Sequence, residues 1–247
     1  MMRIQKYDQC GELVAGFDVQ PGTFISREAF ISVDSKDDVI AFHSYSETEA
    51  EDNPCHIAKV SSNMERVLWD DVINMIDGES SCMPTGIKTD CEDNMYVTGF
   101  MASNRGFIRK YDREGNVLWT KADFQDQVTE VVYDPREDLL IVTMSTESVV
   151  MVSSEGQVFK SIVIKDREIA LGDDGYFAFH FMDGQHKIGY LNKDLELVKN
   201  YNILWQDWNS IAWCDKLVPN VYGTEVYLTC SPNDAQDVII FQVAHIV

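Results

Sequence analysis

Long hydrophobic runs are absent from this chain of 247 residues. No stretch of about 18 consecutive apolar residues occurs, so the sequence predicts no membrane-spanning helix. The first residues, Met1 to Asp8, lack the apolar core of a secretory signal, and we therefore expect no such signal in the chain as given. The composition, 45% hydrophobic and 25% charged, is typical of a folded globular protein.

Basic residues are scarce. Lys and Arg number 20 against 41 Asp and Glu, which gives a formal net charge of −21. A field of this sign repels phosphate backbones and anionic lipid headgroups, so we expect neither nucleic acid nor membrane as a partner. The simplest role of the charge is solubility, and a protein partner with a basic surface fits it best.

Closely spaced cysteine pairs are also absent. Zinc sites and small disulfide-rich domains use dense or paired cysteines, and this chain has no Cys-x-x-Cys. The sequence therefore predicts free thiols, several of them buried in strands, in a reducing compartment such as the cytoplasm. The six cysteines are Cys10, Cys55, Cys82, Cys91, Cys214 and Cys230.

Catalytic motifs are missing as well: the chain has no Gly-x-Ser-x-Gly, His-Glu-x-x-His, phosphate-binding loop or Gly-x-Gly-x-x-Gly. We therefore predict no catalytic residue, no cofactor and no metal, which favours a protein that is not an enzyme. His43 and His180 occupy matching positions in the repeat described below, but the other copies hold Gly99, Thr143 and Cys230 there. We interpret both histidines as ordinary strand residues.

Acidic turns offer oxygen atoms that could bind calcium, but none has the twelve-residue spacing of an EF-hand loop. We interpret them as turns whose side chains satisfy nearby backbone groups. The carboxylates concerned are Asp34, Asp37, Asp38, Asp90, Glu92 and Asp93.

What the sequence does contain is a repeat. A strand, a polar turn with Gly and a second strand recur, most clearly from Phe107 to Trp119. The first turn residue is Asp, Asn or Ser, which can accept a hydrogen bond from the backbone two residues on. These residues are Asp8, Ser61, Asp112, Ser153 and Asn192, spaced by 53, 51, 41 and 39 positions.

A second hairpin with an acidic turn lies between these copies. It recurs at 31–42, 87–97, 131–141 and 169–177, and more loosely at 211–228. Two alternating hairpins in each period of about 40 to 50 residues make one four-stranded blade of a β-propeller. A β-sandwich is the alternative, but it does not explain copies in register.

The sequence thus predicts an all-β chain, a β-propeller of about five four-stranded antiparallel blades forming one domain over 1–247. We expect the two chain ends to close the ring, because an open ring leaves free strand edges. One difficulty is that residues 4–8 and 238–247 both read as a third strand, so the ends offer one strand more than a blade needs.

The repeat resembles those of the quinoprotein-like and NHL-like propellers, which carry the phrase strand, Asp-x-x-Gly-x, Val-Leu-Trp. Arg109 to Trp119 is the best match. The resemblance implies the fold and not quinone chemistry, because such repeats also occur in many proteins that are not enzymes.

A non-catalytic interaction or scaffolding propeller is the function that the sequence favours, as a component of a larger assembly such as a virion. Alternatives are a five-bladed carbohydrate-binding lectin and a quinoprotein-like or lactonase-like enzyme with a site over the central channel. We expect Trp69 and Trp119, at matching repeat positions, to pack between blades. The candidate partner contacts are Glu47, Glu49, Glu51 and Asp52 on one acidic loop, and Trp205 and Trp208 in a connection.

Overall fold

The computed structural model describes residues 2–20, 29–44, 53–73, 78–79, 81–163, 166–182, 185–202, 211–220, 225–232 and 239–245. Within these ranges the regular elements are β-strands. No helix in this part of the chain could therefore cross a membrane.

The strands form six antiparallel sheets that follow one another along the chain. The N-terminal pair consists of β1 (Met2–Tyr7) and β2 (Leu13–Gln20). Four complete four-stranded sheets follow, here called blades 1 to 4. The C-terminal sheet has three strands, β19 (Ile211–Pro219), β20 (Glu225–Pro232) and β21 (Ile239–His245).

The blades contain the following strands. Blade 1 has β3 (Ala29–Val33), β4 (Val39–Ser44), β5 (Cys55–Val60) and β6 (Val67–Ile73). Blade 2 has β7 (Cys82–Thr89), β8 (Met95–Met101), β9 (Gly106–Tyr111) and β10 (Val117–Lys121). Blade 3 has β11 (Val128–Asp134), β12 (Leu139–Met144), β13 (Ser148–Ser153) and β14 (Val158–Val163). Blade 4 has β15 (Asp166–Leu171), β16 (Gly175–Met182), β17 (Gln185–Asn192) and β18 (Leu197–Asn202).

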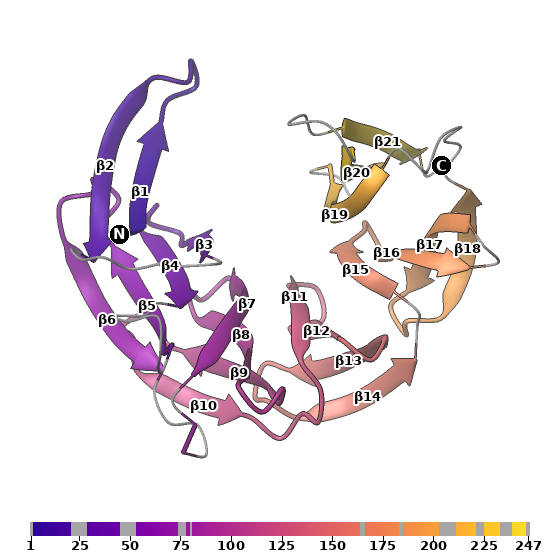
Figure 1. Cartoon of the computed structure of the whole chain (residues 1–247), viewed down its shortest axis with the longest axis horizontal. Coiled ribbons are helices and arrows are strands. Elements are labelled where there is room, and N and C mark those ends of the chain that lie inside the picture. Colours follow the sequence, from indigo (N-terminus) through magenta and orange to yellow (C-terminus); the bar gives the residue numbers. More distant parts are fainter. Residues whose placement is uncertain are drawn as a thin grey trace.

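These sheets stand side by side in an arc with their first strands on the inner side (Figure 1). The predicted all-β propeller is confirmed, and four complete blades plus a three-stranded sheet agree with about five. We predicted that the two chain ends pair and close the ring, but the described strands do not do so. The N-terminal pair and the C-terminal sheet lie at opposite ends of the arc as separate sheets. The reason is the surplus strand: β21 already pairs with β20, where β1 would have to pair.

The predicted turn chemistry is present in all five copies. The side-chain oxygen of each first turn residue accepts hydrogen bonds from the backbone two and four residues on, or four and five in the longer turn at Ser61. In the turn after β9, Asp112 Oδ1 accepts from the amides of Glu114 at 3.0 Å and Asn116 at 2.8 Å. The other copies use Asp8, Ser61, Ser153 and Asn192. The repeat therefore marks hairpins, as predicted.

A left-handed residue completes each of these turns. Gly11, Gly115 and Gly156 have φ between 81° and 89°, where a side chain is disfavoured. The other two turns place Met64 (φ 59°) and Leu195 (φ 57°) there. Both of these side chains are buried in the core, and that burial offsets the cost of the conformation.

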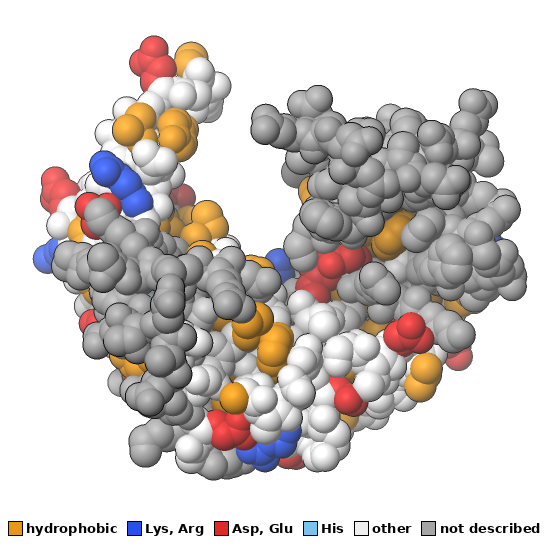
Figure 2. Space-filling model, in the orientation of Figure 1, with side chains coloured by type: hydrophobic (Ala, Val, Ile, Leu, Met, Phe, Trp, Pro, Cys, Tyr) orange, Lys and Arg blue, Asp and Glu red, His pale blue; other side chains and the backbone are white. Residues whose placement is uncertain are grey.

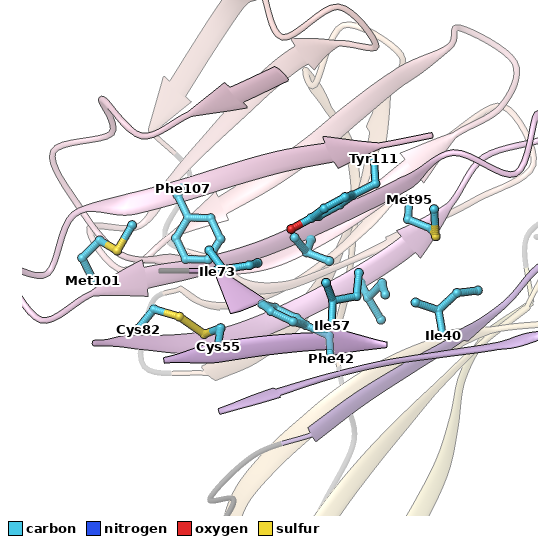
Figure 3. Packing of buried hydrophobic residues seen from close by; sticks show 12 residues of the cluster. Ile40, Phe42, Cys55, Ile57, Ile73, Cys82, Met95, Met101, Phe107 and Tyr111 are labelled. Atoms are coloured by element: carbon cyan, nitrogen blue, oxygen red, sulfur yellow. A yellow bond between two sulfur atoms is a disulfide. The ribbon is translucent and has the colours of Figure 1, made fainter. Parts of the chain in front are cut away.

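Apolar side chains from facing blades form a separate core between each pair of neighbours. Figure 3 shows the core between blades 1 and 2, where Phe42 and Ile57 meet Met95, Phe107 and Tyr111. The strand pattern explains this layering, because alternate residues of one strand point to opposite faces and so to opposite neighbours.

Hydrogen bonds also join each blade to the next, and one set runs from the fourth strand to a backbone carbonyl in the turn between the third and fourth strands of the following blade. Trp69 Nε1 donates to the carbonyl of Arg113 at 3.2 Å, and Trp119 Nε1 donates to that of Ser154 at 2.9 Å. At the equivalent position in blade 3, Lys160 donates to the carbonyl of Asp194. The predicted packing of Trp69 and Trp119 between blades is confirmed.

Substitution of Gly115 tests this contact. A Cβ at Gly115 would lie 2.6 Å from Cδ2 of Trp69, on a residue with φ of 89°. We expect Gly115→Ala to lower the free energy of unfolding by about 2 kcal/mol, from backbone strain and overpacking together. Gly11→Ala is the matched control, since Gly11 has φ of 81° but no atom within 4 Å of its Cβ. Urea unfolding of both variants measures the difference, and equal losses would show that the tryptophan contact contributes nothing.

The cysteine prediction is wrong for two residues. Cys55 at the start of β5 and Cys82 at the start of β7 form a disulfide, with Cα atoms 5.7 Å apart (Figure 3). Their separation of 27 residues hid the pairing, because only the fold brings these two strand ends together. Cys10 and Cys91 are free and exposed, as predicted for thiols. The side chains of Cys214 and Cys230 lie outside the described residues, and the compartment stays a prediction.

Candidate interaction surfaces

The turns between first and second strands and between third and fourth strands all lie at one end of the sheets. This follows from the antiparallel order, in which every second connection returns to the same end. We call this end the turn face. It consists of the segments 8–12, 34–38, 61–66, 90–94, 112–116, 135–138, 154–157, 172–174 and 193–196.

The turn face carries much of the negative charge of the chain. Its nine segments hold eighteen acidic and five basic residues. The described connections 102–105, 122–127 and 145–147 at the opposite end hold three acidic residues and one basic residue. Among the described connections, the acidic charge therefore lies mainly on the turn face.

Several turn carboxylates satisfy the backbone, as predicted. Asp34 Oδ1 accepts from the amides of Lys36 and Asp38, both at 2.9 Å. Asp90 Oδ1 accepts from the amides of Glu92 at 2.9 Å and Asn94 at 2.8 Å. Among the residues whose positions are described, no group of three acidic, His or Cys side chains is arranged to hold a metal ion.

A buried ion pair lies under the turn face between blades 1 and 2. Lys59 Nζ is 2.6 Å from Asp34 Oδ2, and the two side chains are 6% and 1% exposed. That oxygen accepts no regular hydrogen bond in the described structure, so the ammonium compensates its charge. The pair borders a cavity of about 270 Å³ that Trp69 and Arg113 also line.

Asp93 extends this cluster across the interface between the blades. It accepts hydrogen bonds from Ser35 Oγ at 2.6 Å and from the Ser35 amide at 2.8 Å. These bonds lower the pKa of Asp93 below its ordinary value. The cluster thus links the acidic turns of two blades.

The inner side of the arc is largely apolar. A central cavity of about 460 Å³ is lined by first-strand residues from all four blades and β19, including Phe30, Ile87, Val131, Ile169 and Leu217. Figure 2 shows hydrophobic side chains in orange along part of this inner side. The cavity offers contact area for apolar groups and few polar groups that could perform chemistry.

Two histidines meet inside blade 1. His43 on β4 and His56 on β5 are paired across the strands and buried, and His43 Nε2 lies 3.2 Å from His56 Nδ1. His56 Nε2 lies 3.4 Å from Asp70 Oδ2 on β6. Burial, followed by the neighbouring His56, lowers the pKa of His43 to about 4.

His43 lies on a strand, as predicted, and is buried there, but the sequence reasoning missed His56 as its partner. The signal was the hairpin itself, since β4 and β5 run antiparallel and place residues 43 and 56 opposite each other. The side chain of His180 lies outside the described residues.

The predicted partner contacts cannot be compared with this geometry. Glu47, Glu49, Glu51 and Asp52, and likewise Trp205 and Trp208, lie outside the described residues. The acidic loop joins Ser44 of β4 to Cys55 of β5, at the end of blade 1 opposite to the turn face. It stays a candidate for a contact distinct from the turn face.

Comparison with known proteins supports the fold. No protein-family model and no curated protein matches the chain, whereas 779 chains of solved structures do. One is Raptor from Chaetomium thermophilum, with a TM-score of 0.64 and 10% sequence identity over 95% of this chain. This chain spans only 21% of the length of that Raptor chain. At such low identity the likeness shows the fold alone, and the chain is similar to a β-propeller region without an identified family.

Proposed function

We propose that this protein is a non-catalytic interaction module whose turn face binds a basic protein surface. The observation that carries the proposal is the charge of the turn face, eighteen acidic against five basic residues. A face of one sign steers an oppositely charged partner and raises its association rate. The blades hold the turns at fixed spacing, which gives the charge a defined geometry.

The connections between blades support this role. Inter-blade hydrogen bonds from Trp69, Trp119 and Lys160 end on carbonyls of the turn face, and Ser35 binds Asp93 across two turns. A binding surface loses less entropy on association when it is already ordered. The turn face is therefore suited to a partner that contacts several turns at once.

A short oligolysine peptide can probe the turn face directly. Neutralising one exposed carboxylate in each of blades 1 to 4 should weaken its binding about ten-fold at low salt. An exposed ion pair contributes roughly 0.2–1 kcal/mol, and four such contributions add up to a loss of this size. The substitutions are Asp37→Asn, Glu92→Gln, Glu137→Gln and Asp173→Asn.

The matched control changes the net charge equally but on the predicted loop. Its substitutions are Glu47→Gln, Glu49→Gln, Glu51→Gln and Asp52→Asn. Fluorescence anisotropy at several salt concentrations compares the two variants, and we expect the control to bind nearly as the parent does. Equal weakening would mean that only net charge matters. A larger loss in the control would move the site to the loop.

A further inference from the structure

The strand β1 is a third strand that lacks its second-strand neighbour. Lys6 on β1 donates to the carbonyl of Ser62 in blade 1, at 3.2 Å. Lys59 donates in the same way to Arg113 and Lys110 to Ser154, and both lie on third strands. In blades 1 to 4 the third strand pairs with a second strand and a fourth strand. Within the described residues, β1 pairs with β2 alone.

The N-terminal pair nevertheless sits where the outer half of a blade belongs. Ile4 of β1 and Val19 of β2 are buried against Val39, Ala41 and Ala58 of blade 1. This packing resembles the cores between the complete blades. The outer half of a blade is therefore in place beside blade 1, and the described strands leave the position of its inner half open.

Aliphatic side chains on β3 point into this open position. Ile31 and Val33 lie opposite Ala41 and Val39 in the β3–β4 ladder, on the face that meets the N-terminal pair. Ile31 is 62% exposed and Val33 is 50% exposed.

The residues equivalent to Ile31 in the next three blades are covered by the preceding blade. Ile87, Val131 and Ile169 are 4%, 1% and 2% exposed, each in the core shared with the preceding blade. Ile31 has the same chemistry and place in the repeat but lacks that cover.

The C-terminal sheet does not supply the missing strands in this structure. Its second strand, β20, pairs with β21 from Glu225 to Cys230 along the edge that β1 would need. Pairing β20 with β1 would therefore require β21 to leave. The described strands therefore leave this position open.

We propose that β1 and the exposed face of β3 form a docking site for two antiparallel strands of a partner protein. The strand next to β1 completes its backbone hydrogen bonds by β-augmentation, and the other strand lies over Ile31. This surface is separate from the turn face and does not depend on charge.

The second strands of three of the complete blades predict which side chains the partner strand should carry. In blades 1, 3 and 4, the second strand turns large apolar residues at alternate positions toward the next blade. The pairs are Ile40 and Phe42, Leu139 and Ile141, and Phe177 and Phe179. The partner strand next to β1 should therefore carry two large apolar residues separated by one residue, both facing blade 1.

A hairpin taken from the protein itself is the probe. A labelled peptide with the sequence 128–144 contains the first and second strands of blade 3, and cyclisation through its paired ends preorganises it. The peptide is acidic, so attraction to the acidic turn face cannot produce its binding. We expect it to bind the intact protein in fluorescence anisotropy and to slow hydrogen exchange at the amides of β1.

Three variants make this experiment decisive. Ile31→Asp should weaken peptide binding ten-fold or more, because one isoleucine is no longer buried. Val163→Asp, at a residue 79% exposed on the fourth strand of blade 3, should leave binding unchanged. A peptide carrying Leu139→Asp and Ile141→Asp should not bind.

Two results would overturn the proposal. One is the absence of binding, or binding that Ile31→Asp does not weaken. The other is a free protein in which β1 amides are already protected and Ile31→Asp lowers the melting temperature. That second result would show that the chain covers the site itself.

Discussion

Replacing Lys59 with methionine should destabilise the protein by about 3–5 kcal/mol, the usual cost of leaving a buried charge without its partner. Asp34 Oδ2 lies 2.6 Å from Lys59 Nζ, and both side chains are almost completely buried. Methionine keeps the length of the side chain and removes the ammonium. The carboxylate would retain only the two backbone amides on its other oxygen, from Lys36 and Asp38.

Urea unfolding at neutral pH measures this loss of stability. Two further variants test whether the uncompensated charge of Asp34 causes it. Asp34→Asn combined with Lys59→Met should recover a large part of the loss, because no uncompensated charge remains. Lys110→Met at the equivalent position of blade 2 should cost less. Lys110 lies 3.8 Å from Asp90 Oδ2, and that oxygen also accepts from Asn94 and the hydroxyl of Tyr96. Equal losses at the two lysines would contradict this account of the Asp34–Lys59 pair.

Acidification should destabilise the protein between about pH 6.5 and 4 through His43. An unfolded histidine has a pKa near 6.5, whereas burial lowers that of His43 to about 4. In this window the unfolded chain binds a proton that the folded chain does not, so the free energy of unfolding falls as the pH falls. The shift corresponds to about 3 kcal/mol by pH 4.

The geometry explains why the folded state resists this proton. One of the two facing nitrogens of His43 and His56 must donate and the other accept across 3.2 Å, and a proton on both would make them repel. Unfolding curves at pH 7, 5.5 and 4.5 for the parent and for His43→Gln measure the effect. The variant should lose most of the slope above pH 4.5. Carboxylates with a lowered pKa, such as Asp93 and Asp134, act in the same direction mainly below about pH 4. An unchanged slope in His43→Gln would assign the acid sensitivity to other groups.

The fold was largely readable from the sequence because its signals are local. Hairpins depend on residues a few positions apart, and anchors such as Asp112 and Ser153 act on their own turns. Contacts between blades were partly readable: equivalence in the repeat predicted the packing of Trp69 and Trp119, but not which carbonyl each would reach. The disulfide between Cys55 and Cys82 and the ion pair of Lys59 with Asp34 depend on how strands meet in space. Spacing along the chain does not encode such pairs.

The candidate surfaces also differ in how far the sequence alone could predict them. Sequence analysis favoured the acidic loop of Glu47 to Asp52 because its four carboxylates lie within six residues of one another. The acidity of the turn face is scattered over nine short segments, and it becomes one surface only when the strand order is known. The exposure of Ile31 was equally hidden, since its sequence matches those of Ile87 and Ile169 and only the neighbouring sheet differs.

The hydrogen bonds that Lys and Trp side chains donate between blades have a direction, whereas Tyr111 and Tyr176 donate the other way, to Asp71 and Asp134 of the preceding blade. Lys6, Lys59, Trp69, Lys110, Trp119 and Lys160 each donate to a carbonyl in the blade that follows along the chain. If a blade opens on the C-terminal side, its neighbour keeps a donor with no acceptor, in some cases beside a buried carboxylate. If a blade opens on the N-terminal side, its neighbour keeps a carbonyl on the turn face, where water can take over. At these lysine and tryptophan contacts, opening of the last blade should therefore destabilise its neighbour more than opening of the first blade does.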